Sequence, residues 1–230
     1  MMVSGPSRLT QTGFGACNCG GCCGVHTKSD KDLSEFLTEE IEAEKSTVQQ
    51  PGLPNVDGFD ISTDGSVVTM VKAFNSEKVT LTFNVSNTVD VGAQEGQFEA
   101  KDEKGAEASS MVSKPDFTVE VKKGNQTLVF QCSIIDDMEQ SAEGGETQED
   151  GYADSFQIDE VAIHESEYTD STYTVSADIM DGNLYDLFMN FLDERGVKND
   201  FSDKLVQYAT AYEHKLYIGL LEKLKGFVSS

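Results

Sequence analysis

The chain has 230 residues and a formal net charge of −24, from 41 acidic and 17 basic side chains. This balance argues against direct binding to nucleic-acid phosphates or to anionic membranes, because both require clustered lysine and arginine. No apolar stretch is long enough to span a membrane, and a hydrophobic content of 38% suffices for a sizeable core. Basic proteins, polyamines and divalent cations are the partners that the charge favours.

Residues 1–28 are rich in glycine, serine, threonine and cysteine and show no hydrophobic period, so we expect residues 1–25 to be disordered. With Arg8 but no acidic residue, and without the apolar core of a secretory signal, they fit the remnant of an import presequence. Four of the five cysteines lie in Cys17–Cys23. Their spacings could chelate zinc, but the sequence has no partner cluster, so we interpret them as the end of the presequence.

Helical spacing of apolar residues predicts three helices. The first begins near residue 29, with Ser29 or Asp30 as its N-cap, and ends before the prolines at positions 51 and 54. The other two are Asn183–Glu194, which Gly196 is expected to cap, and Ser202–Phe227. The apolar residues of the first helix that could pair with the last helix, as in a coiled coil, are Leu33, Phe36 and Leu37.

Alternation of β-branched residues predicts three antiparallel strand pairs between residues 59 and 178. They are Ser66–Phe74 with Lys78–Val85, Phe117–Lys122 with Thr127–Ile134, and Ser155–His164 with Thr172–Ala177. Cys132 falls in one of these strands, where we expect a small buried side chain. Two long polar connections, at about residues 90–115 and 136–154, are expected to be flexible acidic loops. The order of elements predicts an α+β fold with an antiparallel sheet, formed by one domain over residues 26–230.

Between Lys123 and Arg195 the chain has eighteen acidic residues and no lysine or arginine. We call residues 124–194 the acidic block. It could be a solvated surface without a ligand, but its extent favours a docking surface on which many weak charge contacts add up for a basic ligand. The candidate cationic-ligand residues are Asp136, Asp137, Glu139, Glu143, Glu146, Glu149, Asp150, Asp154, Asp159 and Glu160.

Calcium could also bind these carboxylates, but residues 136–139 lack the spacing and the glycine of an EF-hand. The three histidines lie far apart, and the glycines form no nucleotide-binding pattern. We therefore expect no catalytic residue and no cofactor.

Three C-terminal stretches carry a resemblance to a known family. They are Leu184–Asp186 with Phe191–Val197, Phe201–Leu205, and Glu213-His214 with Tyr217-Ile218 and Leu221–Phe227. Upstream, Glu77–Val85 and Pro115–Phe117 extend the match, so that it covers about residue 26 to the end. These stretches resemble the mitochondrial acidic matrix glycoprotein family.

The resemblance implies a twisted antiparallel sheet of seven strands, flanked by one N-terminal and two C-terminal helices, in a ring-shaped homotrimer. It also implies a non-enzymatic protein of the mitochondrial matrix that supports translation, ribosome assembly and respiration, with minor pools at the cell surface, in the nucleus or in the cytoplasm. The implied partners are ribosomal proteins, arginine-rich splicing factors, complement component 1 Q and kininogen, and contact with RNA would be indirect.

The alternative is a cell-surface receptor module for the globular heads of complement component 1 Q, for kininogen or for hyaluronan. Hyaluronan is an anion, so its binding would need a local basic patch. Lys114, Lys122, Lys123 and the C-terminal lysines are the candidates for such a patch.

Overall fold

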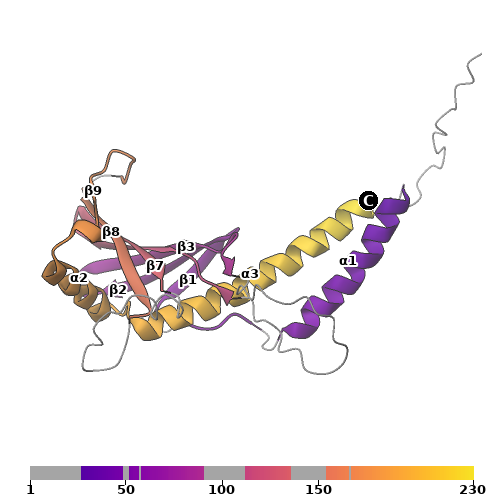
Figure 1. The fold of residues 1–230 in the computed structure, drawn as a ribbon, viewed down its shortest axis with the longest axis horizontal. Coiled ribbons are helices and arrows are strands. Elements are labelled where there is room, and N and C mark those ends of the chain that lie inside the picture. The colour runs from indigo at the N-terminus through magenta and orange to yellow at the C-terminus, as the bar shows by residue number, and fades with distance from the viewer. Residues whose placement is uncertain (1–26, 49–51, 57, 91–111, 136–153, 166) are drawn as a thin grey trace, which may run out of the picture.

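A computed structural model gives the fold and describes residues 27–48, 52–56, 58–90, 112–135, 154–165 and 167–230. One helix, a run of strands and two further helices follow one another along the chain, which confirms the predicted α+β class (Figure 1). Residues 1–25, with the cysteine cluster, lie outside the described residues. So do 91–111 and 136–153, which make up most of the two long connections. The predicted presequence and flexible loops therefore stay predictions.

Seven antiparallel strands form one sheet in the order β1-β2-β3-β6-β7-β8-β9. The strands are β1 (Asp60–Asp64), β2 (Val67–Phe74), β3 (Glu77–Asn84), β6 (Phe117–Lys123), β7 (Gln126–Ile134), β8 (Phe156–His164) and β9 (Thr174–Ser176). Strands β4 (Val89–Asp90) and β5 (Val112–Ser113) form a separate two-stranded ribbon. Alternate residues such as Val79, Leu81 and Phe83 are buried, as expected for a sheet that is covered on one face.

The covering layer consists of α2 (Gly182–Glu194) and the first half of α3 (Asn199–Val228). Phe130 of β7 packs edge-on against Phe188 of α2, with 5.4 Å between ring centroids. Phe83 of β3 meets Tyr208 of α3 in the same way at 6.5 Å. The main hydrophobic core therefore lies between the sheet and these two helices.

The C-terminal half of α3 extends beyond the sheet and runs alongside α1 (Lys28–Thr47) (Figure 1). We call α1 together with residues 213–228 of α3 the arm. Its own small core consists of Leu37, Ile41 and Leu221. The predicted pairing of the first and last helices is confirmed. Of the three residues predicted to form the contact, however, only Leu37 is buried, whereas Leu33 is 45% and Phe36 57% exposed.

Several predicted boundaries were wrong for local reasons. The N-cap of α1 is Thr27, because its hydroxyl accepts from the Asp30 amide (3.1 Å) while the Asp30 carboxylate accepts from the Thr27 amide (2.9 Å). This capping box starts the helix before Ser29. Helix α3 starts at Asn199, three residues before the predicted start. Strand β1 and the β4–β5 ribbon were missed. Strand β9 is shorter than predicted at both ends, because Thr172 belongs to a turn with Thr169 and because Ala177 begins the 3-10 helix η2 (Ala177–Ile179).

The junction between α2 and α3 is a tight turn that ends α2. Gly196 has a φ of +86°, which favours glycine, and its amide donates to the Asp193 carbonyl (2.8 Å). The Val197 amide donates to the Leu192 carbonyl (3.0 Å), and both of these side chains are fully buried. This is a Schellman motif with its hydrophobic contact. Gly196 therefore terminates the helix as predicted, one position after the C-cap residue Arg195.

Candidate acidic docking surface

The structure describes three of the ten candidate ligand residues. Asp154 precedes β8 and Glu160 lies within it, and both side chains are exposed. The other seven candidates, at positions 136–150, lie outside the described residues, and their role stays a prediction.

Asp159 differs from its neighbours because the strand holds its carboxylate. The pairing of β8 with β7 skips this residue, which makes it the extra residue of a β-bulge. Its Oδ1 atom accepts hydrogen bonds from Ser133 Oγ (3.0 Å) and Gln157 Nε2 (3.0 Å). Asp159 is half-buried, so we assign it a structural role in shaping β8 and rank it below the exposed carboxylates as a ligand residue.

Cys132 lies on the covered face of the sheet and is 1% exposed, which confirms the prediction of a small buried side chain. Burial raises the pKa of its thiol, and the negative charge of Asp159 raises it further. The thiol is therefore protonated at neutral pH and is a poor nucleophile.

Eight further carboxylates of the acidic block are exposed on ordered elements. They are Glu165, Glu167, Asp170, Asp178, Asp181, Asp186, Asp193 and Glu194. The candidates named from the sequence stopped at Glu160, although the signal that identified them, the absence of cations, continues to Glu194. Asp181 also caps α2, because its carboxylate accepts from the amides of Asn183 (3.0 Å) and Leu184 (3.3 Å).

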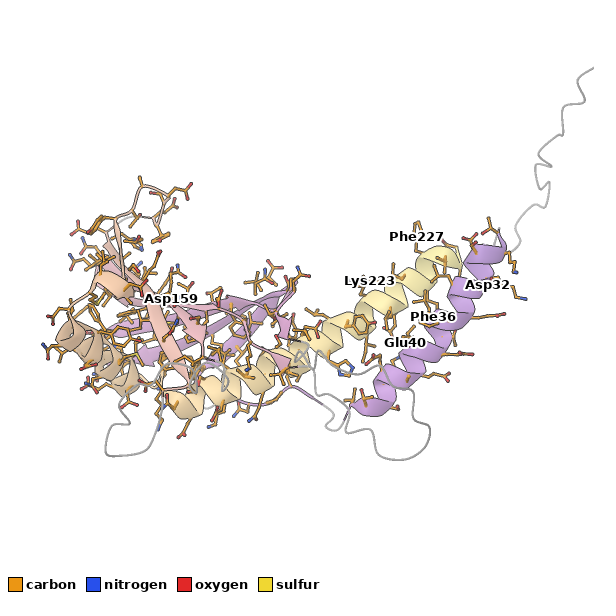
Figure 2. The ribbon with its side chains drawn as sticks, in the orientation of Figure 1. Asp32, Phe36, Glu40, Asp159, Lys223 and Phe227 are labelled. Atoms are coloured by element: carbon orange, nitrogen blue, oxygen red, sulfur yellow. The ribbon has the colours of Figure 1, made fainter. Side chains whose placement is uncertain are left out.

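These carboxylates are distributed over strand β8, the connection to β9, helix η2 and helix α2. These elements pack on the main core, and Figure 2 labels Asp159 on β8 among them. These negative charges therefore lie at fixed positions on the surface, so that no loop needs to become ordered before they can act together.

Arg195, the cation that ends the acidic block, is 6% exposed and is used inside the protein. Its Nε and Nη2 atoms each lie 2.8 Å from Oε2 of Glu77 at the start of β3. Its guanidinium carbon lies 3.4 Å from the ring centroid of Phe191 and 5.0 Å from that of Phe74. The positive charge of Arg195 is thus neutralised mainly in the interior by Glu77, and its contact with the exposed Glu194 carboxylate is longer, at 3.8 Å.

Neither a metal site nor a membrane span is found among the residues that the structure describes. No group of three or more histidine, cysteine and acidic side chains there is arranged to hold a metal ion. No described helix combines the length and the apolar character needed to cross a bilayer.

The sequence matches the family described as mitochondrial glycoprotein (MAM33) over residues 37–228. It is 38% identical to the bovine mitochondrial complement component 1 Q subcomponent-binding protein, over 98% of this chain and 81% of that protein. It is 37% identical to the human protein of the same name, over 90% of this chain and 74% of that protein. The crystal structure of the p22 protein of Trypanosoma brucei superposes with a TM-score of 0.61 at 21% identity, covering 88% of this chain and all of p22.

The fold and the acidic surface define an acidic α+β protein with a seven-stranded antiparallel sheet covered by helices. The chain belongs to the mitochondrial glycoprotein (MAM33) family, because the family match covers most of its length and relatives above 30% identity match over nearly all of it. The resemblance seen in the sequence is thereby confirmed.

We expect replacement of Arg195 by methionine to destabilise the protein by about 3 kcal/mol, because Glu77 is left buried without its main partner. Urea denaturation followed by circular dichroism measures the loss. The double variant Arg195→Met/Glu77→Gln should lose less than the sum of the two single changes. Lys198→Met is the control, since Lys198 is exposed and its loss should cost well under about 1 kcal/mol. Equal effects of Arg195→Met and Lys198→Met would contradict a structural role for Arg195.

Proposed function

We propose that this chain is a non-enzymatic binding protein for basic proteins. The observation that carries the proposal is the imbalance of the described part of the acidic block. Ten of its eleven carboxylates are exposed, and the only nearby arginine is buried in an internal ion pair. Such a surface attracts cations over several ångströms and gains affinity from many weak contacts. No single contact needs to be strong.

The cellular role that fits this chemistry is that of a chaperone for basic proteins in the mitochondrial matrix. Ribosomal proteins are strongly basic, and masking their charge before assembly would support mitochondrial translation and, through it, oxidative phosphorylation. Membership of the mitochondrial glycoprotein family and the names of the mammalian relatives support a mitochondrial location. Arginine-rich splicing factors and kininogen belong to the same chemical class of ligand, and contact with RNA would then pass through its basic proteins.

We further propose that the chain assembles as a ring-shaped homotrimer, in which the arm of each copy contacts the next copy. Besides Tyr217, five large apolar side chains of the arm are exposed in the single chain. They are Leu33, Phe36, Leu220, Leu224 and Phe227, which we call the arm stripe. Figure 2 labels Phe36 and Phe227, which lie on the part of the arm farthest from the sheet. An exposed apolar surface of this kind marks a protein–protein contact, and a trimer would present the acidic block three times.

The second candidate function is a cell-surface receptor for complement component 1 Q, kininogen or hyaluronan. The mammalian relatives are named for binding to complement component 1 Q, which favours this ligand. For an anionic ligand, Lys78 and Lys122 lie directly opposite each other on β3 and β6, and both are exposed beside Lys123. Like charges in this arrangement repel, and an anion would relieve the repulsion.

Binding of a basic ligand should depend on the position of the carboxylates and not only on net charge. The probe is a peptide that alternates lysine and glycine, and the change is Glu160→Gln/Asp178→Asn/Asp186→Asn. We expect weaker binding and a shallower salt dependence, with affinity of the native chain falling on the order of tenfold between 50 and 200 mM salt. Isothermal titration calorimetry measures both.

The matched control for this experiment neutralises three exposed carboxylates of α1, Asp32→Asn/Glu39→Gln/Glu42→Gln. It changes the net charge equally and should leave the affinity almost unchanged. Equal losses in the two variants would mean that bulk charge alone attracts the peptide. Absence of binding to the native chain at low salt would refute the proposed function.

Light scattering coupled to size exclusion should give a mass three times the 25.1 kDa of the chain. The double change Phe36→Glu/Phe227→Glu places charges within the arm stripe and should reduce the mass to that of one chain. Tyr173→Glu is the control, because Tyr173 and Phe227 are both 80% exposed and Tyr173 lies outside the arm. A mass unaffected by the stripe variant would contradict the proposed contact.

The two candidate locations are separated by protease protection. If the protein acts in the matrix, external protease added to intact cells or intact mitochondria should leave it uncut, and lysis of the inner membrane should expose it. Cleavage on intact cells at the rate of a known surface protein would instead favour the receptor function.

A further inference from the structure

The connection between β8 and β9 projects from the sheet at the end of the molecule opposite the arm (Figure 1). We call its residues 165 and 167–173 the β8–β9 tip. The Thr172 amide donates to the Thr169 carbonyl (2.8 Å), and the Thr169 amide donates to the Thr172 hydroxyl (3.0 Å). These reciprocal bonds close a turn, so the tip presents its other side chains from an ordered backbone.

Two tyrosines of the tip are exposed in the single chain. Tyr173 is 80% and Tyr168 41% exposed. One side of the Tyr168 ring is fixed by the ring of His164, with 5.9 Å between centroids and an interplanar angle of 67°. Exposed aromatic rings of this kind are common at sites of protein–protein contact, where their faces become buried.

Three carboxylates accompany the two rings. Glu165, Glu167 and Asp170 are exposed, and Glu165 accepts a hydrogen bond from Gln126 Nε2 at 3.1 Å. The sequence has no lysine or arginine from Asp154 to Glu194, so the tip itself carries neither. A ligand that combines positive charge with a flat apolar face would complement both kinds of group at once.

The interior of the same protein shows how an aromatic ring and a carboxylate together hold a guanidinium group. The guanidinium of Arg195 stacks on Phe191, with 3.4 Å from its central carbon to the ring centroid. At the same time it contacts the Glu77 carboxylate at 2.8 Å. A guanidinium is planar, weakly hydrated and able to stack and to pair with a carboxylate together, whereas the lysine ammonium is compact and strongly hydrated. Aromatic rings and a carboxylate thus hold this arginine together, with a second ring, that of Phe74, at 5.0 Å.

We propose that the β8–β9 tip is a docking site for arginine side chains in an extended segment of a basic protein. Tyr168 and Tyr173 stack on guanidinium groups, and Glu167 and Asp170 pair with their charge. The proposal rests on the proposed function and adds a specific site and a preference for arginine over lysine. Because the acidic surroundings repel phosphates, the partner is a protein and not a nucleic acid or a lipid headgroup.

The test compares two peptides of equal length and charge, one alternating arginine with glycine and the other lysine with glycine. The native full-length chain should bind the arginine peptide more tightly, by about two- to fivefold for each ring that stacks. The double variant Tyr168→Leu/Tyr173→Leu keeps the apolar bulk and removes the aromatic faces. Its affinity for the arginine peptide should fall to that for the lysine peptide, while the affinity for the lysine peptide stays unchanged.

The control variant is Tyr217→Leu, because Tyr217 is also partly exposed but lies on the arm. It should keep the full preference for arginine. Amide chemical shifts that move at Tyr168, Thr169 and Tyr173 on addition of the arginine peptide would place the contact at the tip. Light scattering should give the same mass for the double variant as for the native chain. A loss of mass would show that the tip contacts a second copy, which overturns the proposal.

The tip site would also be overturned if the native chain bound the two peptides equally. The same holds if Tyr217→Leu lost as much preference for the arginine peptide as the double variant does. Either result would leave the proposed function standing. If neither peptide binds the native chain at low salt, the proposed function fails as well. The two failures are therefore distinguishable.

Discussion

The buried pair of Arg195 and Glu77 joins the sheet to the end of α2 across 118 residues of sequence. Glu77 begins β3, and Arg195 is the C-cap of α2, immediately before the glycine that turns the chain into α3. The guanidinium also donates to the Phe191 carbonyl (2.9 Å), so it binds the last turn of α2 and the sheet together. Because a buried charge is tolerated only when it is paired, this contact fixes where both C-terminal helices lie on the sheet.

The same pair determines the electrostatics of the surface. Arg195 is the first lysine or arginine after seventy-one residues that contain neither, and its guanidinium pairs with Glu77 inside the fold. Of the exposed carboxylates of β8, η2 and α2, Glu194 lies 3.8 Å from Arg195 Nη1, and each of them is held by an element that the core fixes in place. Such an arrangement costs some stability through self-repulsion and gives the surface its attraction for cations. A folded acidic surface differs in this respect from an acidic tail, which would lose entropy on binding.

Sequence patterns predicted the elements whose apolar residues repeat strongly. Apolar residues alternate in β2 and β3 and follow helical spacing in α2 and α3, because each of these elements buries one side. Such a pattern can be seen in the sequence alone. Strand β1 was missed because it is an edge strand whose five residues are mostly exposed, and the β4–β5 ribbon because each strand has two residues. The partner of Arg195 lies 118 residues away, and no local pattern predicts a contact at that distance. The tip was missed because aromatic residues are usually expected to be buried, and only the structure shows that Tyr173 is exposed.

The central claim is that ordered carboxylates, and not only the segment at 136–153, attract basic partners. The most direct measurement replaces residues 137–152 by a short uncharged glycine–serine linker and determines the affinity for an alternating lysine–glycine peptide as a function of salt. The account predicts that binding persists, with a lower affinity and a shallower salt dependence, because the carboxylates from Asp154 to Glu194 remain in place. Complete loss of binding in a variant that keeps the native circular dichroism spectrum would contradict it.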